Sequence, residues 1–178
     1  MIYLFLAEGY EECEALVPLD ILRRANVEIK TVGVGNDTVK SSHRIWLNCD
    51  TTTENLSFEN LDGIILPGGM PGTLNLKNND TVQAAIDYCA NNNLLIAAIC
   101  AAPLILGNKN LLNDKNATCY PGFENELLGA NILDQKVVKD GNIITACGVG
   151  AAFEFGFEIL KYLKGSQNTE EIKSTMKY

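Results

Sequence analysis

Residues 94–103 read LLIAAICAAP, an unbroken apolar run that ends in Cys100 and is followed by two alanines and Pro103. A short continuous apolar run is typical of a strand buried inside a parallel sheet. Small residues let the backbone turn after such a strand, and a proline fixes φ for the first turn of a helix. The segment therefore predicts a strand, a tight elbow at Cys100 and a helix, which together indicate an α/β fold.

A cysteine at this elbow would stand at the N-terminus of the following helix. There the positive end of the helix dipole and the unpaired N–H groups favour thiolate over thiol. Free cysteine is also among the most buried residue types and usually behaves as a small apolar side chain. The elbow alone leaves open whether Cys100 is a nucleophile or a core residue.

The composition predicts a single domain over residues 1–178, because 178 residues with 47% apolar content can bury one sizeable core. The formal net charge is -8, and only 14 residues are Lys or Arg. Nucleic-acid binding requires a basic stripe. We therefore expect no nucleic-acid partner, and a small neutral or carbonyl substrate fits better.

The cysteines are Cys13, Cys49, Cys89, Cys100, Cys119 and Cys147. They form no Cys-x-x-Cys pair and none stands beside a histidine, so we expect no metal. The chain is also long enough to fold without disulfides. This pattern favours reduced thiols in a cytoplasmic protein.

The N-terminal residues MIYLFL are apolar but lack a basic start, and Glu8 soon interrupts them. The run is too short for a signal peptide or a membrane segment. It predicts the first strand of the sheet, and we expect no membrane association.

Strand-like and helix-like segments alternate along the chain. Strands are expected at 2–6, 28–34, 63–66 and 94–99, and helices up to residue 25 and over 82–90. This order predicts a mainly parallel sheet with helices on both faces. An antiparallel excursion is expected at 39–47, and Asp140-Gly141 predicts a hairpin.

The C-terminal region predicts two further helical segments. Phe153, Phe157 and Leu160 have the spacing of one buried helix face. After Gly165, Asn168 can cap a last helix.

Residues 66–72, LPGGMPG, close a predicted strand with a pair of glycines. Glycines let a backbone N–H approach a ligand closely, and ligands of α/β sheets bind beyond the carboxyl ends of strands. This turn and the Cys100 elbow are expected at that edge. The amides of Gly69 and Ala101 are candidate oxyanion-hole donors, although a plain tight turn explains the glycines as well.

Residues 9–14, GYEECE, follow the first predicted strand and open onto the same edge. Carboxylates in a first helical turn are usually solvated partners of the helix dipole. Pro18 is tolerated only near a helix start, which places Glu14 at the mouth of that helix. If Glu14 is buried against Cys100, desolvation should keep it protonated, so that it donates a hydrogen bond to the sulfur.

The segments AEGYEECEA (7–15), LPGG (66–69) and AAICAAP (97–103) together resemble the DJ-1/ThiJ/PfpI superfamily, especially its parkinsonism-associated deglycase-like branch. The likeness extends over nearly the whole chain. It implies a flavodoxin-like three-layer sandwich, related to the class I glutamine amidotransferases, and usually a homodimer. It also implies a site of one cysteine and one glutamate, here Cys100 and Glu14, with oxyanion donors at Gly69 and Ala101.

The activities that this resemblance implies fall into two classes. One is an enzyme acting on reactive carbonyls, as a glutathione-independent glyoxalase or a deglycase of glycated side chains. The other is a non-catalytic oxidative-stress sensor or chaperone-like protein whose cysteine is oxidised to sulfinate. The sequence does not decide between the enzyme and the non-catalytic protein. A role in thiazole or thiamin metabolism has no support in these residues.

The chain departs from the family pattern at the position of a histidine that many members carry near the thiol. The matching residue is Tyr120, and a phenol, with an ordinary pKa near 10, is a poor general base at neutral pH. Slower turnover than in histidine-bearing relatives is therefore expected. The only histidine, His43, lies where relatives often carry Ser-Arg near the dimer interface, which favours a surface or interface role.

Residues 146–151, ACGVGA, depart from the family's usual Gly-Pro-Gly-Thr or Ser turn, so we expect fewer polar contacts to substrate here. These glycines match the dinucleotide fingerprint only in part, because Phe153 occupies its third glycine position. We expect no cofactor.

Two related enzyme classes do not fit. Glutamine amidotransferases need a histidine downstream of the thiol, and none follows Cys100. The peptidase-like branch places a histidine directly after the nucleophile, where this chain has Ala101.

Overall fold

A seven-stranded sheet of order β10-β11-β7-β6-β1-β2-β5 forms the centre of the computed structural model, which describes residues 1–178 except for the side chain of Asn55. Its strands are β1 (Ile2–Leu6), β2 (Ile29–Gly33), β5 (Thr51–Thr52), β6 (Gly63–Leu66), β7 (Leu95–Ile99), β10 (Val137–Asp140) and β11 (Ile143–Ala146). Only β10 pairs antiparallel, with β11. The predicted mainly parallel sheet is confirmed.

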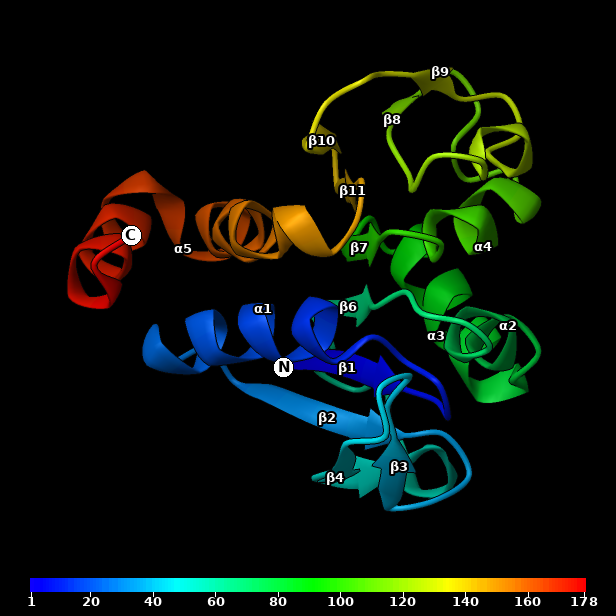
Figure 1. Cartoon of the computed structure of the whole chain (residues 1–178), viewed down its shortest axis with the longest axis horizontal. Coiled ribbons are helices and arrows are strands. Elements are labelled where there is room, and N and C mark those ends of the chain that lie inside the picture. Colours follow the sequence, from blue (N-terminus) through cyan, green and yellow to red (C-terminus); the bar gives the residue numbers. More distant parts are fainter.

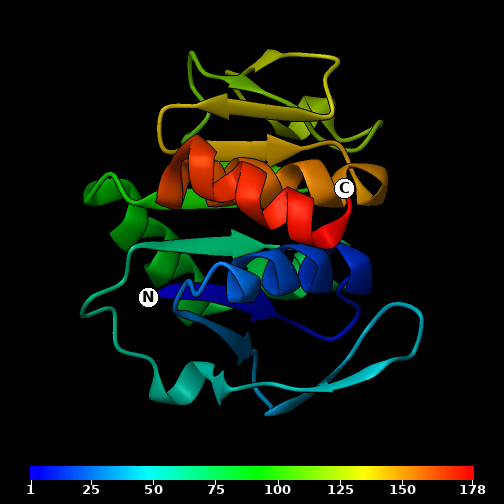
Figure 2. The ribbon, with the colours of Figure 1, turned by 90° about the vertical axis from the view of Figure 1, so that its left-hand side faces the viewer.

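Five α-helices cover the two faces of this sheet. They are α1 (Glu12–Arg24), α2 (Gly72–Lys77), α3 (Asp80–Asn91), α4 (Pro103–Asn108) and α5 (Ala152–Met176). In Figure 1, α1 and α5 lie on the left of the sheet and α2, α3 and α4 on the right. The rotated view of Figure 2 shows α1 and α5 side by side in front of the strands. The chain is therefore a three-layer sandwich.

Short segments complete the chain outside the central sheet. Strands β3 (Thr38–Lys40) and β4 (Trp46–Asn48) form the predicted antiparallel excursion, and β8 (Asn116–Ala117) pairs with β9 (Asn131–Ile132). The 3-10 turns are η1 (Thr53–Asn55), η2 (Glu124–Glu126) and η3 (Val149–Ala151). The hairpin expected at Asp140-Gly141 joins β10 to β11.

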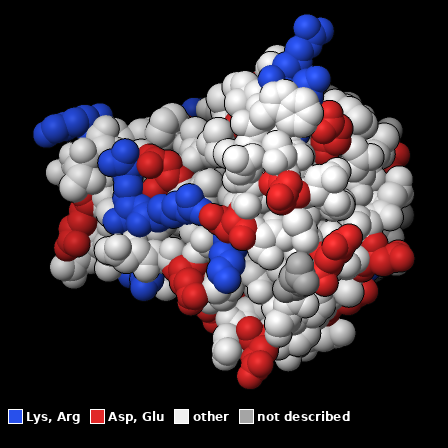
Figure 3. Space-filling view, turned by 90° about the horizontal axis from the view of Figure 1, so that it is seen from below, with Lys and Arg blue, Asp and Glu red and all other residues white. Residues whose placement is uncertain are grey.

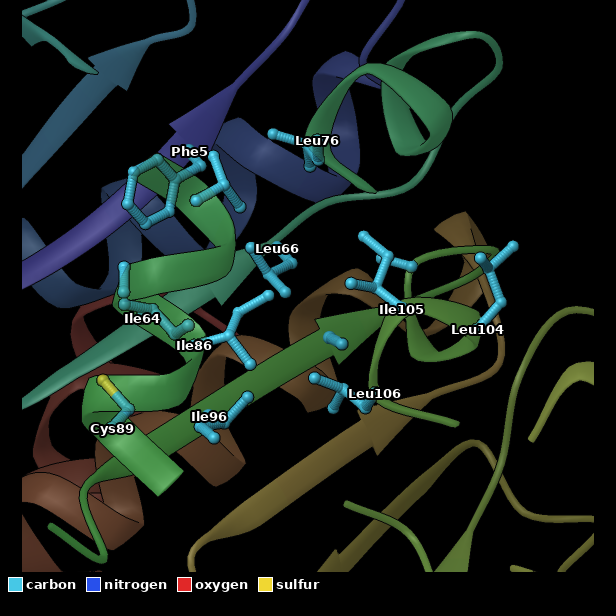
Figure 4. Close-up of a cluster of buried hydrophobic side chains, with 14 of the residues drawn as sticks. Phe5, Ile64, Leu66, Leu76, Ile86, Cys89, Ile96, Leu104, Ile105 and Leu106 are labelled. Carbon is cyan, nitrogen blue, oxygen red and sulfur yellow. The ribbon is translucent and has the colours of Figure 1, made fainter. Parts of the chain in front are cut away.

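Two buried clusters lie on opposite faces of the sheet because side chains alternate along each strand. On β1, Tyr3 and Phe5 contribute to the cluster beneath α2–α4, whereas Ile2, Leu4 and Leu6 contribute to the cluster beneath α1 and α5. Figure 4 shows part of the first cluster, where Leu66, Ile86 and Ile96 pack between strands and helix α3. The central strands are buried on both faces, which explains their unbroken apolar sequences.

The C-terminal helix differs from the prediction in two respects. Phe153 is 41% exposed and stacks on Tyr178, whereas Phe155 is fully buried, so the predicted buried stripe was wrong at Phe153. Gly165 has φ 83° and ψ 170°, which kinks α5, and helix resumes directly after it. Asn168 therefore lies inside the second segment and is not its cap.

Charged side chains of both signs are dispersed over the face shown in Figure 3, and no continuous basic stripe crosses the described atoms of that face. This distribution agrees with the acidic composition. No helix among the described residues combines the length and apolar character needed to cross a membrane.

The close crossing of α1 and α5 depends on Gly156. A Cβ atom at this position would lie 2.6 Å from Ile21 Cδ1 and 3.0 Å from Pro18 Cα. We expect Gly156→Val to destabilise the fold by roughly 1–3 kcal/mol, because an overpacked core shifts side chains and backbone. Urea unfolding measures the change. Gly150→Ala is the control, since no atom lies within 4 Å of its built Cβ, and equal stability losses in both variants would contradict the proposed steric cause.

Candidate active site

Cys100 occupies the elbow between β7 and α4 in a left-handed conformation, with φ 65°. Its amide donates to the Ala146 carbonyl at 2.8 Å, and its own carbonyl accepts from the Tyr120 amide at 2.8 Å. A non-glycine residue in this region of φ/ψ space carries backbone strain of order 1–3 kcal/mol. The two hydrogen bonds hold the strained elbow from both sides, and they leave the half-buried thiol at the carboxyl edge of the sheet.

Glu14 reaches this thiol from the first turn of α1. The backbone N–H of Glu14 donates to Glu11 Oε2 at 2.7 Å, so the Glu11 carboxylate caps the helix. The Glu14 side chain is only 1% exposed, and its Oε2 accepts from the Gly68 amide at 2.9 Å. The same carboxyl group makes a hydrogen bond with Cys100. The structure thus brings together the two residues that the sequence pairs.

The turn after β6 allows this approach. A Cβ atom on Gly68 would lie 2.6 Å from Glu14 Oε2 and 2.7 Å from Cys100 Cβ, so any side chain there would push the pair apart. Gly69 has φ 87°, which favours glycine. The amides of Gly69 and Ala101 both make hydrogen bonds with the Cys100 sulfur. The predicted oxyanion donors therefore converge on the thiol.

Burial dominates the proton affinity of both groups. It raises the pKa of the Glu14 carboxyl from 4.5 to about 7, and the hydrogen bonds from Cys100 and Gly68 act in the opposite direction. Burial also raises the pKa of the Cys100 thiol to about 12, with a further increase from the Glu14 charge. The lowering expected from a helix N-terminus is wrong for this thiol, because α4 has only six residues and burial outweighs its dipole.

The protonation state of Glu14 decides what Cys100 can do. A protonated carboxyl carries no charge to oppose the thiolate and can donate its O–H to the sulfur. The amides of Ala101 and Gly69 also lower the pKa of the thiol. Since both side chains interact directly, they titrate as a pair, and the first proton leaves the pair near pH 7. After this loss the pair holds one proton, and Cys100 is a thiolate in those molecules in which that proton is on Glu14.

Tyr120 lies beside the elbow and is 50% exposed. A Cβ atom on Gly148 would lie 3.2 Å from its Cδ2, so the ring covers the turn that follows β11. Its amide holds the Cys100 carbonyl, which makes the backbone of Tyr120 part of the elbow.

His43 is exposed, and its Nδ1 lies 2.9 Å from Glu12 Oε1. Among the described residues, the group with metal-ligand potential is Glu11, Glu12 and His43, whose ligand atoms lie within 4.8 Å of one another. Helix capping by Glu11 and the Glu12–His43 pair account for these side chains without a metal. The absence of a metal cofactor remains a prediction.

Sequence reasoning missed two supporting residues. It assigned the donor role to Gly69 but not the contact of the Gly68 amide with Glu14. It also missed Glu11 as the cap of α1. The position of Glu11, three residues before Glu14, was a signal for the cap that the sequence offered. The role of Gly68 depends on how the ends of β1, β6 and β7 meet in space, which no local motif shows.

The family model described as DJ-1/PfpI family matches residues 1–162. The chain belongs to this family. Protein dj-1beta of Drosophila melanogaster is 34% identical over 94% of this chain and 91% of its own length. The glutathione-independent glyoxalase DJR-1.2 of Caenorhabditis elegans is 29% identical over 93% of this chain and 89% of its own length.

Solved DJ-1 structures share the fold. The oxidized DJ-1 of Toxoplasma gondii superposes with a TM-score of 0.95 at 27% identity, covering 99% of this chain and 97% of that one. Drosophila melanogaster DJ-1beta superposes with a TM-score of 0.92 at 32% identity, covering 98% and 96%. These matches confirm the predicted α/β fold and the DJ-1/PfpI resemblance.

The raised pKa of Glu14 makes the stability of this DJ-1/PfpI protein depend on pH. Its contribution is fully present below pH 4.5, where the carboxyl is protonated in both the folded and the unfolded chain, and is lost as the pH rises to about 7. A glutamine side chain cannot ionise, so we expect Glu14→Gln to stabilise the fold at pH 8 but not at pH 4. The limit is on the order of 3 kcal/mol, at about 1.4 kcal/mol per pKa unit.

Thermal or urea unfolding of both proteins at the two pH values measures this difference. Glu59→Gln is the matched control, because Glu59 is exposed and the same change in charge should not alter stability in this way. A Glu14→Gln protein no more stable than the parent at pH 8 would show that the buried carboxylate carries no such cost.

Proposed function

We propose that this protein acts on reactive carbonyl compounds, with methylglyoxal as the simplest substrate, by adding Cys100 to the aldehyde carbon. The observation that carries this proposal is the buried Glu14 carboxyl, which makes a hydrogen bond with Cys100 and has a pKa raised to about 7. A group with that pKa can both give and accept a proton at neutral pH. The family relationship to a glutathione-independent glyoxalase supports the same chemistry.

The first step is attack of the Cys100 thiolate on the aldehyde carbon. The carbonyl π electrons move to oxygen, the amides of Gly69 and Ala101 stabilise the oxyanion, and Glu14 delivers its proton to give a hemithioacetal. The Glu14 carboxylate can then accept the proton bound to the sulfur-bearing carbon, which leaves an enediolate, and return it to the neighbouring carbon. The hydroxyl proton passes to the neighbouring oxygen, so the sulfur-bearing carbon becomes the carbonyl carbon of a thioester. Hydrolysis of the resulting thioester gives lactate and regenerates the thiol, so methylglyoxal and one water are converted to lactate.

Glycated side chains are the second substrate class of this proposal. Early adducts of an aldehyde with a protein thiol or amine release the aldehyde reversibly, and the same Cys100 addition would consume it. A site in which Glu14 performs all proton transfer, with Tyr120 where many relatives carry histidine, is expected to turn over more slowly than theirs. A cytoplasmic homodimer is the proposed setting, in line with the family pattern.

Cys100→Ser should abolish methylglyoxal turnover, because a serine hydroxyl in this site has no comparable nucleophilicity. Glu14→Gln should reduce turnover by roughly 10²-fold or more, the usual contribution of a positioned general acid–base group. Turnover by the parent protein should rise with pH through about 7, where the Cys100–Glu14 pair loses its first proton. Lactate formation, followed enzymatically, is the measurement.

Cys13→Ser is the matched control for thiol loss, since Cys13 is exposed and makes no part of the candidate active site. It should retain the parent rate. Turnover by Cys100→Ser equal to that of the parent protein would sink the proposal.

The second candidate function is a sensor of oxidative stress. It is favoured by the half-exposed thiol at a strained elbow and by the absence of histidine from the candidate active site, since oxidation requires an accessible thiolate but no base for turnover. A chaperone-like role belongs to the same non-catalytic class.

For this sensor, limited peroxide should oxidise Cys100 before the other thiols, and excess peroxide should carry it to sulfinate. Burial raises the pKa of Cys49, Cys89 and Cys119 without a carboxyl donor at the sulfur. Peptide mass spectrometry after alkylation gives the order of oxidation. Oxidation of other cysteines while Cys100 remains free would count against the sensor. Glu14→Gln should keep Cys100 among the first thiols oxidised, because the introduced amide can still donate to the sulfur.

A further inference from the structure

Cys147 follows strand β11 just as Cys100 follows the adjacent strand β7. Ala146 is the registered partner of Ile99 in this parallel pair, and the Cys100 amide donates to the Ala146 carbonyl at 2.8 Å. Neighbouring strands lie about 4.8 Å apart, and a disulfide joins Cα atoms roughly 4.4–6.8 Å apart. Because Cys100 and Cys147 each follow directly after this registered pair, we expect their Cα atoms to lie within the range that a disulfide spans.

The two side chains also share one face of the sheet. Cys100 and Cys147 are both half-buried, and both pack against the cluster beneath α1 and α5. In a regular strand, the residue after Ile99 would point to the opposite face. The left-handed conformation of Cys100 departs from regular strand geometry, so this alternation does not hold at the elbow.

The remaining four cysteines do not share this position. Cys89 and Cys119 are buried in the cluster on the opposite face, and Cys13 is exposed on α1. Cys49 precedes β5 at the far edge of the sheet, beyond β6, β1 and β2, so several strand spacings of about 4.8 Å separate it from β7.

Gly148, directly after Cys147, is buried beneath Tyr120, whereas the backbone beyond it is exposed. Gly148 has φ 152°, and no atom lies within 4 Å of a Cβ built on Gly150. Val149 between them is 50% exposed. A disulfide requires a specific dihedral geometry, and the exposed backbone at Val149 and Gly150 can accommodate a small shift.

We propose that Cys147 is the resolving thiol for oxidised Cys100, so that peroxide converts the pair to an intramolecular disulfide. The Cys100 thiolate attacks the peroxide O–O bond, which yields a sulfenic acid at Cys100 and hydroxide. The Cys147 sulfur then attacks the sulfenic sulfur, the S–S bond forms, and the hydroxyl group leaves with the Cys147 proton as water. Each disulfide consumes one peroxide, which is the oxidant, and two thiols are oxidised.

This step goes beyond carbonyl chemistry and does not require it. A disulfide at Cys100 removes the nucleophile reversibly, whereas sulfinate is not reduced by ordinary thiols. Cys147 would thus protect Cys100 from irreversible oxidation and would switch the site off until a dithiol restores it.

The test is stoichiometric peroxide treatment of the reduced full chain, followed by alkylation and non-reducing tryptic peptide mapping. Trypsin leaves Cys100 in peptide 78–109, together with Cys89, and Cys147 in peptide 140–161. We expect these peptides as a cross-linked species that has lost two hydrogen atoms, with fragment ions placing the bond at Cys100. Cys147→Ser should eliminate this species and increase sulfinate at Cys100 severalfold, whereas Cys119→Ala should leave both unchanged.

The proposal would be overturned if sulfinate were the first product at Cys100 while Cys147 could still be alkylated. A disulfide from Cys147 to Cys89 would also overturn it. Failure of the carbonyl proposal is distinguishable, because reduced Cys147→Ser should form lactate at the rate of the reduced parent protein. If neither protein turns over methylglyoxal, peptide mapping still shows whether the Cys100–Cys147 disulfide forms. A parent protein that forms the cross-link but does not regain its free thiols with dithiothreitol would contradict the reversible switch.

Discussion

The contact between the Glu14 carboxyl and the Cys100 thiol is the constraint on which the rest of the site depends. The sheet order β1-β6-β7 brings together the ends of three strands, and each end supplies one part. The segment after β1 leads into the helix that carries Glu14, the turn after β6 carries Gly68, and the elbow after β7 carries Cys100. Gly68 has no side chain, so the two reactive groups can meet across the end of β6. A change in the position of any one strand would separate the pair.

Holding this contact has a cost in stability. The buried Glu14 carboxyl disfavours its charged form, and Cys100 adopts a strained left-handed backbone. Each of these terms is on the order of a few kcal/mol, against a total stability of about 5–15 kcal/mol for an ordinary domain. The two apolar clusters on either side of the sheet offset both terms. Residues such as Gly156, which let α1 and α5 pack closely, therefore support the candidate active site from a distance.

Local signals made the fold and the members of the site predictable, whereas features set by long-range packing were not. Unbroken apolar runs such as residues 94–99 indicate strands buried on both faces, and Cys100 and Glu14 followed from motifs at strand ends. The apolar pattern of the helix did not distinguish Phe155, which is buried in the core, from Phe153, which is partly exposed and stacks on the C-terminal Tyr178. The pKa values of Glu14 and Cys100 could not be predicted for the same reason, because long-range packing decides how far each group is removed from water. A helix start alone favoured a low thiol pKa, yet burial raises it to about 12.

This reversal changes how the chemistry of the site is understood. A cysteine with a low pKa would be thiolate at all times and open to any electrophile. Here the thiolate depends on a proton held by Glu14, in a chain whose one histidine is exposed and paired with Glu12. Reactivity at Cys100 is therefore tied to a buried proton rather than to a permanent charge. Tyr120 packs against Gly148, next to Cys147, and its amide holds the Cys100 carbonyl, so one residue joins the elbow after β7 to the turn after β11. In the proposed chemistry a carbonyl and an oxidant would compete for one thiolate population, so a shift of the Glu14 proton would change both reactions.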